Sequence, residues 1–113
     1  MLNQAVLVGR IVSEPELKET DKGKVANITI AVPRSFKNAN GDYDTDFLDV
    51  VLWKGVAEST TEYCKKGDLV GIKGRMQSTK NEKGFNAIQV VAEKVTFLSS
   101  KKIEEDNEKD IKM

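Results

Sequence analysis

Aromatic residues stand at a spacing that would suit contact with the bases of a nucleic acid. Phe47 and Trp53 delimit the segment FLDVVLW. Because strand side chains alternate with a period of two, both rings share one face with Asp49. The opposite face is aliphatic and is expected to point into the core (Leu48, Val50 and Leu52). A carboxylate beside rings about 20 Å apart indicates a partly wet face on which bases could stack. The alternative is that both rings pack under a helix, a loop or a second subunit.

Basic side chains recur near this platform. In the segment 69–79, Lys73, Arg75 and Gln77 alternate with apolar residues, so two cations fall on the face that points away from the core. The core face is expected to hold three apolar residues of this segment (Val70, Ile72 and Met76). Two such cations can follow a phosphate backbone, although the same pattern is typical of a solvated strand edge. Lys80, in the hairpin that follows, could close over a bound strand.

A third group follows the second apolar segment, where Arg34 and Lys37 flank Phe36. Phe36 has no apolar neighbours close by in the sequence, so its ring is expected to be exposed. Base stacking contributes about 1–3 kcal/mol per base and is indifferent to sequence, while cations add a salt-dependent contribution. Three rings and a few cations on one face would therefore bind single-stranded nucleic acid even without a net positive charge.

The composition limits the chemistry that these residues can perform. Lys plus Arg (18) equals Asp plus Glu (18), so any positive surface must arise from local clustering. The chain has no histidine and a single cysteine, which removes the commonest general base and leaves no thiolate zinc site. Asp49 with Asp46 or Asp44 could in principle hold magnesium, but no base or phosphate cradle accompanies them. Neither enzymatic activity nor a metal or other cofactor is expected.

The elements that position these residues can be read from hydrophobic patterning. Apolar segments rich in β-branched residues predict five strands, at 4–12, 25–32, 47–53, 69–79 and 85–97. Helical spacing of apolar residues predicts a short helix over 56–64, with Cys64 in the core. Gly9 marks a bend or bulge inside the first strand. The polar stretch 34–46 indicates a long hairpin loop.

Three strands, one short helix and two further strands form the order expected of a five-stranded OB-fold barrel, an all-β fold. The barrel domain is predicted to span 1–98. Residues 99–113 have few apolar side chains and no periodicity, which predicts a flexible, disordered and charged C-terminal tail. With one cysteine and no apolar run of membrane-spanning length, a cytoplasmic location is expected.

Five segments, in order, resemble bacterial single-stranded DNA-binding proteins over residues 1–98. They are NQAVLVGRIVSEPELKET, VANITIAV with the following residues 34–37, FLDVVLWKGVAE, EYCKKGDLVGIKGRM and VVAEKVTFL. The resemblance implies base stacking on three aromatic residues (Phe36, Phe47 and Trp53). It also implies backbone contacts from four cations (Lys54, Lys73, Arg75 and Lys80). A homotetramer that pairs through the first strand, binds single-stranded DNA and associates with the nucleoid is further implied.

Two departures from the family pattern change these expectations. Asn81 stands where members often carry another aromatic in the last hairpin, so one stacking site fewer is expected. The chain ends Asp110-Ile111-Lys112-Met113, without the acidic Pro-Phe tip through which members dock replication and repair enzymes. A short accessory form that serves transformation, a plasmid or a phage is consistent with this ending. The alternative function is an OB module that binds protein or structured RNA.

Overall fold

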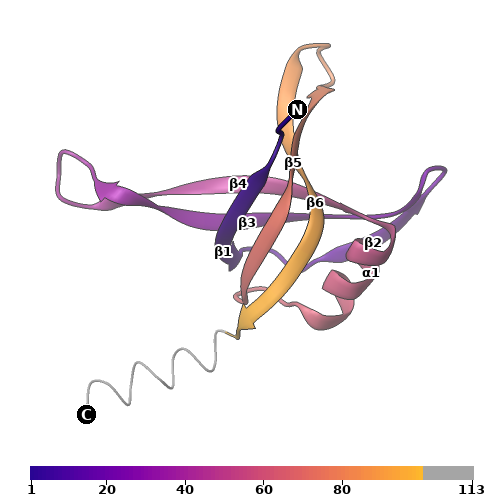
Figure 1. Cartoon of the computed structure of the whole chain (residues 1–113), viewed down its shortest axis with the longest axis horizontal. Coiled ribbons are helices and arrows are strands. Elements are labelled where there is room, and N and C mark those ends of the chain that lie inside the picture. The colour runs from indigo at the N-terminus through magenta and orange to yellow at the C-terminus, as the bar shows by residue number, and fades with distance from the viewer. Residues whose placement is uncertain (101–113) are drawn as a thin grey trace.

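The computed structural model describes residues 1–100, which form six strands and one helix (Figure 1). Most of the predicted tail (101–113) lies outside the described residues. The elements are β1 (Ala5–Ile11), β2 (Glu16–Thr20), β3 (Gly23–Lys37), β4 (Tyr43–Trp53), α1 (Lys54–Tyr63), β5 (Leu69–Lys80) and β6 (Asn86–Ser99). Within the described part of the chain, no helix is long and apolar enough to cross a membrane.

Five of the strands close into a barrel in the order β1-β5-β6-β4-β3. The barrel closes where β1 turns from β5 to β3, through the antiparallel pairs Arg10 with Ala31 and Ile11 with Ile30. Among the strand pairs of residues 1–100, only β4 and β6 run parallel, paired at Val50 with Val90. The helix connects the third and fourth barrel strands, β4 and β5. The predicted OB-fold barrel with one helix is therefore confirmed.

The core lies inside this barrel and follows the predicted alternation of apolar residues. The largest fully buried side chains are Ile11, Ile28, Ile30, Val50, Leu52, Val70 and Ile72. Helix α1 contributes Ala57 and Thr60 to the buried interior. Cys64, directly after the helix, is buried as expected, and burial, reinforced by the Asp68 charge, raises the pKa of its thiol. A buried thiol of raised pKa is a poor nucleophile.

Two long hairpins extend beyond the barrel, and one of them corrects a prediction. The stretch 34–46 is not a loop, because β3 and β4 stay paired from Pro33 with Thr45 to Lys37 with Tyr43, with an irregular register between. Only 38–42 connects them. Asn38 organises this tip by accepting the backbone N–H groups of Asn40 and Asp42 on its side-chain oxygen. Such side-chain bonds leave no trace in hydrophobic periodicity.

Two further expectations were wrong. Strand β2, which pairs with the outer edge of β3, was not predicted, because all five of its side chains are exposed and show no apolar alternation. Met76 was expected beside Ile72 in the core but is exposed. It lies beyond Gly74, where β5 leaves the barrel and continues into the projecting hairpin with β6 (Figure 1).

Close backbone contacts at two glycines allow so small a barrel to close. A side chain at Gly9 would lie 2.6 Å from the carbonyl oxygen of Ala31 on β3. A side chain at Gly74 would overlap the carbonyl oxygen of Val91 on β6. A glycine within a strand allows this kind of approach. The bend predicted at Gly9 is thus a point where two strand backbones meet.

Gly74→Ala should lower the free energy of unfolding by about 1–3 kcal/mol or more, because the new methyl group meets backbone atoms that cannot move aside. Urea unfolding followed by circular dichroism measures the change. Gly71→Ala on the same strand is the matched control, since its new atom would contact only Leu98 Cδ1 at 3.8 Å. Equal stabilities of the two variants would contradict the close-approach explanation.

Candidate nucleic-acid interface

The outer face of β3, β4, β6 and β5 brings together residues that are distant in the sequence. Trp53 pairs with Val25 across β3, while Val51 on β4 pairs with Val91 on β6, which in turn pairs with Arg75 on β5. The three valines form a small buried cluster outside the barrel, and Trp53 packs against it. The ring of Trp53 is therefore anchored on its apolar side and remains half-exposed.

A surface cleft of about 450 Å³ lies beside this ring. It is lined by Lys22, Trp53, Lys54, Arg75, Val91, Ala92 and Glu93. Two predicted cations, Lys54 and Arg75, thus lie next to the predicted stacking ring. Sequence reasoning missed the third cation, Lys22, which comes from the turn between β2 and β3. No sequence pattern indicates Lys22, because only the unpredicted strand β2 carries its turn to the cleft.

Lys54 occupies this place in a strained backbone conformation. It is the one non-glycine residue of the described chain with positive φ, at 51°. The residue before it, Trp53, is still extended, so the chain turns sharply from strand to helix at Lys54. The Lys54 side chain then passes over the β2–β3 turn, where an added atom on Gly23 would lie 3.6 Å from its Cε. A left-handed conformation costs a non-glycine residue about 1–2 kcal/mol.

Phe47 lies six residues before Trp53 on β4, so both side chains point to the same outer face. Its ring is 66% exposed, as the stacking hypothesis requires. Between the two rings, Asp49 accepts a hydrogen bond of 2.8 Å from the hydroxyl of Thr29 on β3. The Asp49 charge is thus hydrogen-bonded but not neutralised, and it repels phosphates. A strand bound here must turn its bases, rather than its backbone, toward the middle of the platform.

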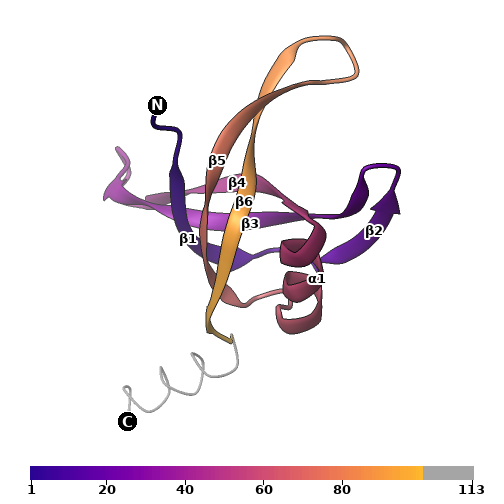
Figure 2. The same cartoon turned by 45° about the vertical axis from the view of Figure 1, so that its right-hand side comes forward.

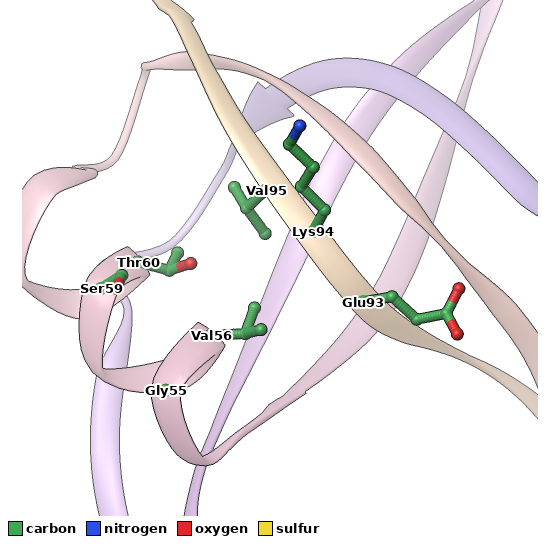
Figure 3. A pocket seen from close by; sticks show the side chains of 7 residues that line it. All are labelled: Gly55, Val56, Ser59, Thr60, Glu93, Lys94 and Val95. Atoms are coloured by element: carbon green, nitrogen blue, oxygen red, sulfur yellow. The ribbon is translucent and has the colours of Figure 1, made fainter.

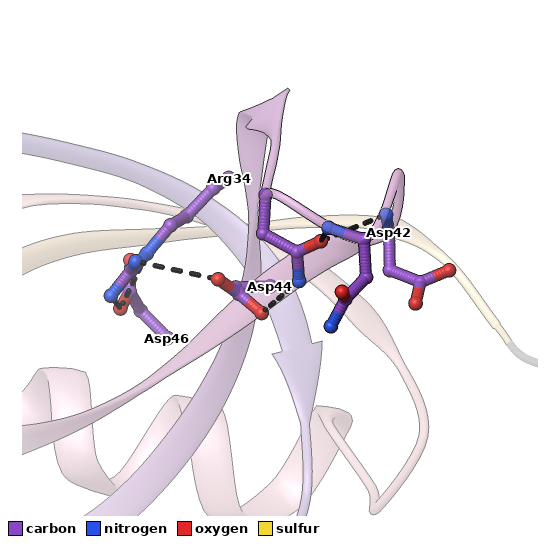
Figure 4. Close-up of polar contacts among 6 residues, drawn as sticks. Arg34, Asp42, Asp44 and Asp46 are labelled. Atoms are coloured by element: carbon purple, nitrogen blue, oxygen red, sulfur yellow. Dashed lines mark hydrogen bonds and ion pairs between the residues drawn. The ribbon is translucent and has the colours of Figure 1, made fainter.

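The β3–β4 hairpin holds Arg34 in ion pairs with its own carboxylates (Figure 4). The Arg34 guanidinium donates to Asp46, with Nη2 2.9 Å from Oδ1, and its Nη1 lies 3.7 Å from Asp44. The hydrogen bond and charge of Arg34 lower the pKa of Asp46, so this carboxylate stays ionised. The positive charge of Arg34 is therefore already offset on the exposed arm.

Aromatic rings are nevertheless displayed on this arm. Phe36 is 65% exposed, as predicted. The Nζ atom of Lys37 lies 5.8 Å from the ring centroid of Tyr43, within the range of a cation–π contact. Tyr43 is itself exposed and was not identified from the sequence. Its aromatic side chain was the available signal, but the surrounding stretch was predicted to be a long hairpin loop.

The remaining predicted cations lie elsewhere. Lys73 pairs with Val6 on β1 and with Lys94 on β6, so it lies on the β1 side of the outer surface. Lys80 ends β5 far out on the hairpin, where it pairs with Asn86 and falls on the face opposite Arg75. The structure thus groups Trp53 with two predicted cations and separates the others from it.

Asp49 does not lie with Asp44 and Asp46, as the magnesium site considered from the sequence would require. Asp44 and Asp46 surround Arg34, whereas Asp49 contacts Thr29. Within residues 1–100, no group of three or more cysteine, aspartate or glutamate side chains could hold a metal ion.

A second pocket, of about 250 Å³, lies between α1 and β6 (Figure 3). Val56, Thr60 and Val95 point into it, while Glu93 points away. Its lining pairs no nucleophile with a general base.

Comparison with known proteins gives a consistent result. The model of the Single-strand binding protein family matches residues 2–98. The chain is 46% identical over 106 residues to Single-stranded DNA-binding protein B of Bacillus subtilis, covering 89% of this chain and 94% of that protein. It is 44% identical to Single-stranded DNA-binding protein 3 of Listeria innocua, covering 89% of this chain and 66% of that protein.

A solved structure shares the fold. It is the crystal structure of a deletion mutant of the single-stranded DNA binding protein from Thermus aquaticus, with a TM-score of 0.73 at 26% identity. The match covers 87% of this chain and 51% of that one. The residues that the family model matches, 2–98, include both projecting hairpins and the lining of the Trp53 cleft. This chain belongs to the Single-strand binding protein family.

Proposed function

We propose that this protein binds single-stranded DNA without sequence selection and without turnover. The observation that carries the proposal is the Trp53 cleft, where one half-exposed ring lies beside Lys22, Lys54 and Arg75. A base stacks on the exposed side of the ring while its phosphates contact the surrounding cations. Every base has an aromatic face, so stacking does not select a sequence.

The relative size of the two contributions follows from the charge distribution. Each stacked base contributes about 1–3 kcal/mol. Each phosphate neutralised on a single strand adds about 0.7 to the slope of log affinity against log salt. Arg34 and Arg75 already have carboxylate partners, Asp46 and Glu93. Stacking on Trp53 and the exposed phenylalanines therefore dominates, and the salt dependence is modest.

The proposal extends to assembly and location. On β1, Val6 and Val8 are exposed, and a groove of about 440 Å³ opens where β1 diverges from β3. These features support pairing of subunits through β1 into a homotetramer, which static light scattering would measure. A cytoplasmic, nucleoid-associated protein fits this activity. The names of the relatives do not favour the alternative of a protein- or RNA-binding module.

Titration with poly-dT tests the function directly. Fluorescence of Trp53 should be quenched by poly-dT and recovered by added salt, with much weaker binding to duplex DNA. Phe36→Ala and Phe47→Ala should each weaken binding of a labelled dT oligonucleotide about 5–150-fold, at unchanged stability, because both rings are exposed. Tyr63→Ala, which removes a 69% exposed ring on α1, is the control and should bind normally. Tight binding to duplex alone would refute the proposal.

Lys54→Gly should weaken oligo-dT binding but raise the free energy of unfolding. Relief of the left-handed backbone gains about 1–2 kcal/mol, which exceeds the entropy cost of a glycine, about 0.5–1 kcal/mol. Lys54→Ala separates the two effects, since it removes the cation but keeps the strain. Thermal melting and fluorescence anisotropy measure stability and affinity. If neither variant changes the affinity, Lys54 does not contribute to DNA binding.

Asp46→Asn should strengthen binding, because it removes the closer of the two carboxylate partners of Arg34 and so makes the guanidinium more available to a phosphate. The slope of log affinity against log salt should become steeper by about 0.7 for the added phosphate contact. Asp42→Asn on the same hairpin changes the net charge equally but does not touch the Arg34 ion pairs. If both variants gain affinity equally, general charge reduction rather than release of Arg34 explains the effect.

A further inference from the structure

The tip of the β5–β6 hairpin is built around Asn81. Its side-chain oxygen accepts the backbone N–H groups of Lys83 and Phe85, each at 3.0 Å. Its backbone N–H donates to the Phe85 carbonyl at 2.9 Å, and its carbonyl accepts from Gly84. Gly84 takes the positive φ of 82° that closes a three-residue loop. Asn81 therefore organises the turn and fixes Phe85 directly opposite itself.

The register of the hairpin determines which face Phe85 belongs to. Arg75 pairs with Val91, and the pairing continues without irregularity to Lys80 with Asn86. Extending this alternation, Asn81 and Phe85 fall on the same face as Arg75 and Val91. That is the outer face, which also carries Trp53. One continuous surface therefore runs from the Trp53 cleft along the hairpin to Phe85.

The Phe85 ring has no packing function that would explain it. It is 67% exposed at the end of a hairpin that projects well beyond the barrel (Figure 2). Lys83 lies in the same turn, and Lys80 directly precedes the turn on the other face of the hairpin, with Glu82 as the one acidic residue of the turn. An exposed ring with a local excess of positive charge is the combination that holds a base and its phosphate.

We propose that Phe85 is an additional base-stacking residue, which extends the binding surface from Trp53 to the tip of the β5–β6 hairpin. The inference rests on the proposed binding of single-stranded DNA and defines how far that surface reaches. From Val91 to Phe85 the surface covers about 20 Å, at about 3.3 Å per residue. This corresponds to about six nucleotides at the 3.4 Å rise of one strand in a duplex. The ring that stacks at this tip is therefore on the strand opposite Asn81, which closes the turn.

A fluorescent probe at this position tests the proposal. In a Trp53→Phe background, Phe85→Trp places the only tryptophan at the hairpin tip. A long dT oligonucleotide should quench its fluorescence, with recovery at high salt. Tyr63→Trp in the same background is the control and should not be quenched. In the unmodified background, Phe85→Ala should weaken binding of a 20-nucleotide dT strand about 5–150-fold. Binding of a strand of about three nucleotides, half the distance from the Trp53 cleft to Phe85, should be unchanged.

The outcomes separate this inference from the function on which it rests. If poly-dT quenches Trp53 but not the tryptophan of Phe85→Trp, Phe85 does not stack and the proposed function stands. If neither is quenched, the proposed function fails, and the role of Phe85 fails with it. A change in molecular mass by light scattering in Phe85→Ala, with unchanged dT affinity, would overturn the proposal in favour of a contact between subunits.

Discussion

The arrangement of the whole molecule depends on the closeness with which strand backbones approach each other in the barrel. Strand β1 must pair with β5 along most of its length and then reach β3, and Gly9 makes this possible by leaving room for the Ala31 carbonyl. Gly74 serves β5 and β6 in the same way. Beyond the barrel, β3 stays paired with β4 and β5 with β6, and these continuations are the two projecting hairpins (Figure 1).

The outer face provides local positive charge, which the overall composition does not. A chain with equal numbers of acidic and basic residues cannot attract DNA through its net charge. The structure instead concentrates Lys22, Lys54 and Arg75 around one ring and keeps Arg34 in pairs with carboxylates. In the proposed function, affinity therefore depends mainly on exposed aromatic surface, and the cations position the DNA backbone beside it.

The sequence alone predicted the parts of the fold that have regular hydrophobic patterning. The alternation in FLDVVLW correctly placed Leu52 in the core and Phe47 outside, and the barrel followed from the order of such segments. Prediction failed where tertiary pairing or side-chain hydrogen bonds decide the structure. Strand β2 has no apolar face to detect. Lys22 depends on β2, so its position in the cleft could not be foreseen either.

The two hairpin tips have the same local structure, which depends on side-chain hydrogen bonds that hydrophobic patterning does not reveal. Residues 37–42 read KNANGD and residues 80–85 read KNEKGF. In both, the asparagine side chain accepts the N–H groups two and four positions later, and the glycine has a φ near 83° or 82°. The same turn therefore extends both hairpins. The Lys, Asn and Gly positions are shared, and the turn ends in Asp42 on one arm and in Phe85 on the other.

The β3–β4 and β5–β6 hairpins therefore share the same turn but differ in the side chains that their tips expose. On the β3–β4 arm, Asp42 adds to the negative charge of Asp44 and Asp46, and the rings lie further back along the strands. On the β5–β6 arm, the turn ends in an aromatic ring. The family resemblance places an aromatic side chain at position 81, so Asn81 taken alone suggests that one stacking site is lost. In the structure, however, Asn81 closes the turn with its side chain, and this turn places the exposed Phe85 directly opposite it.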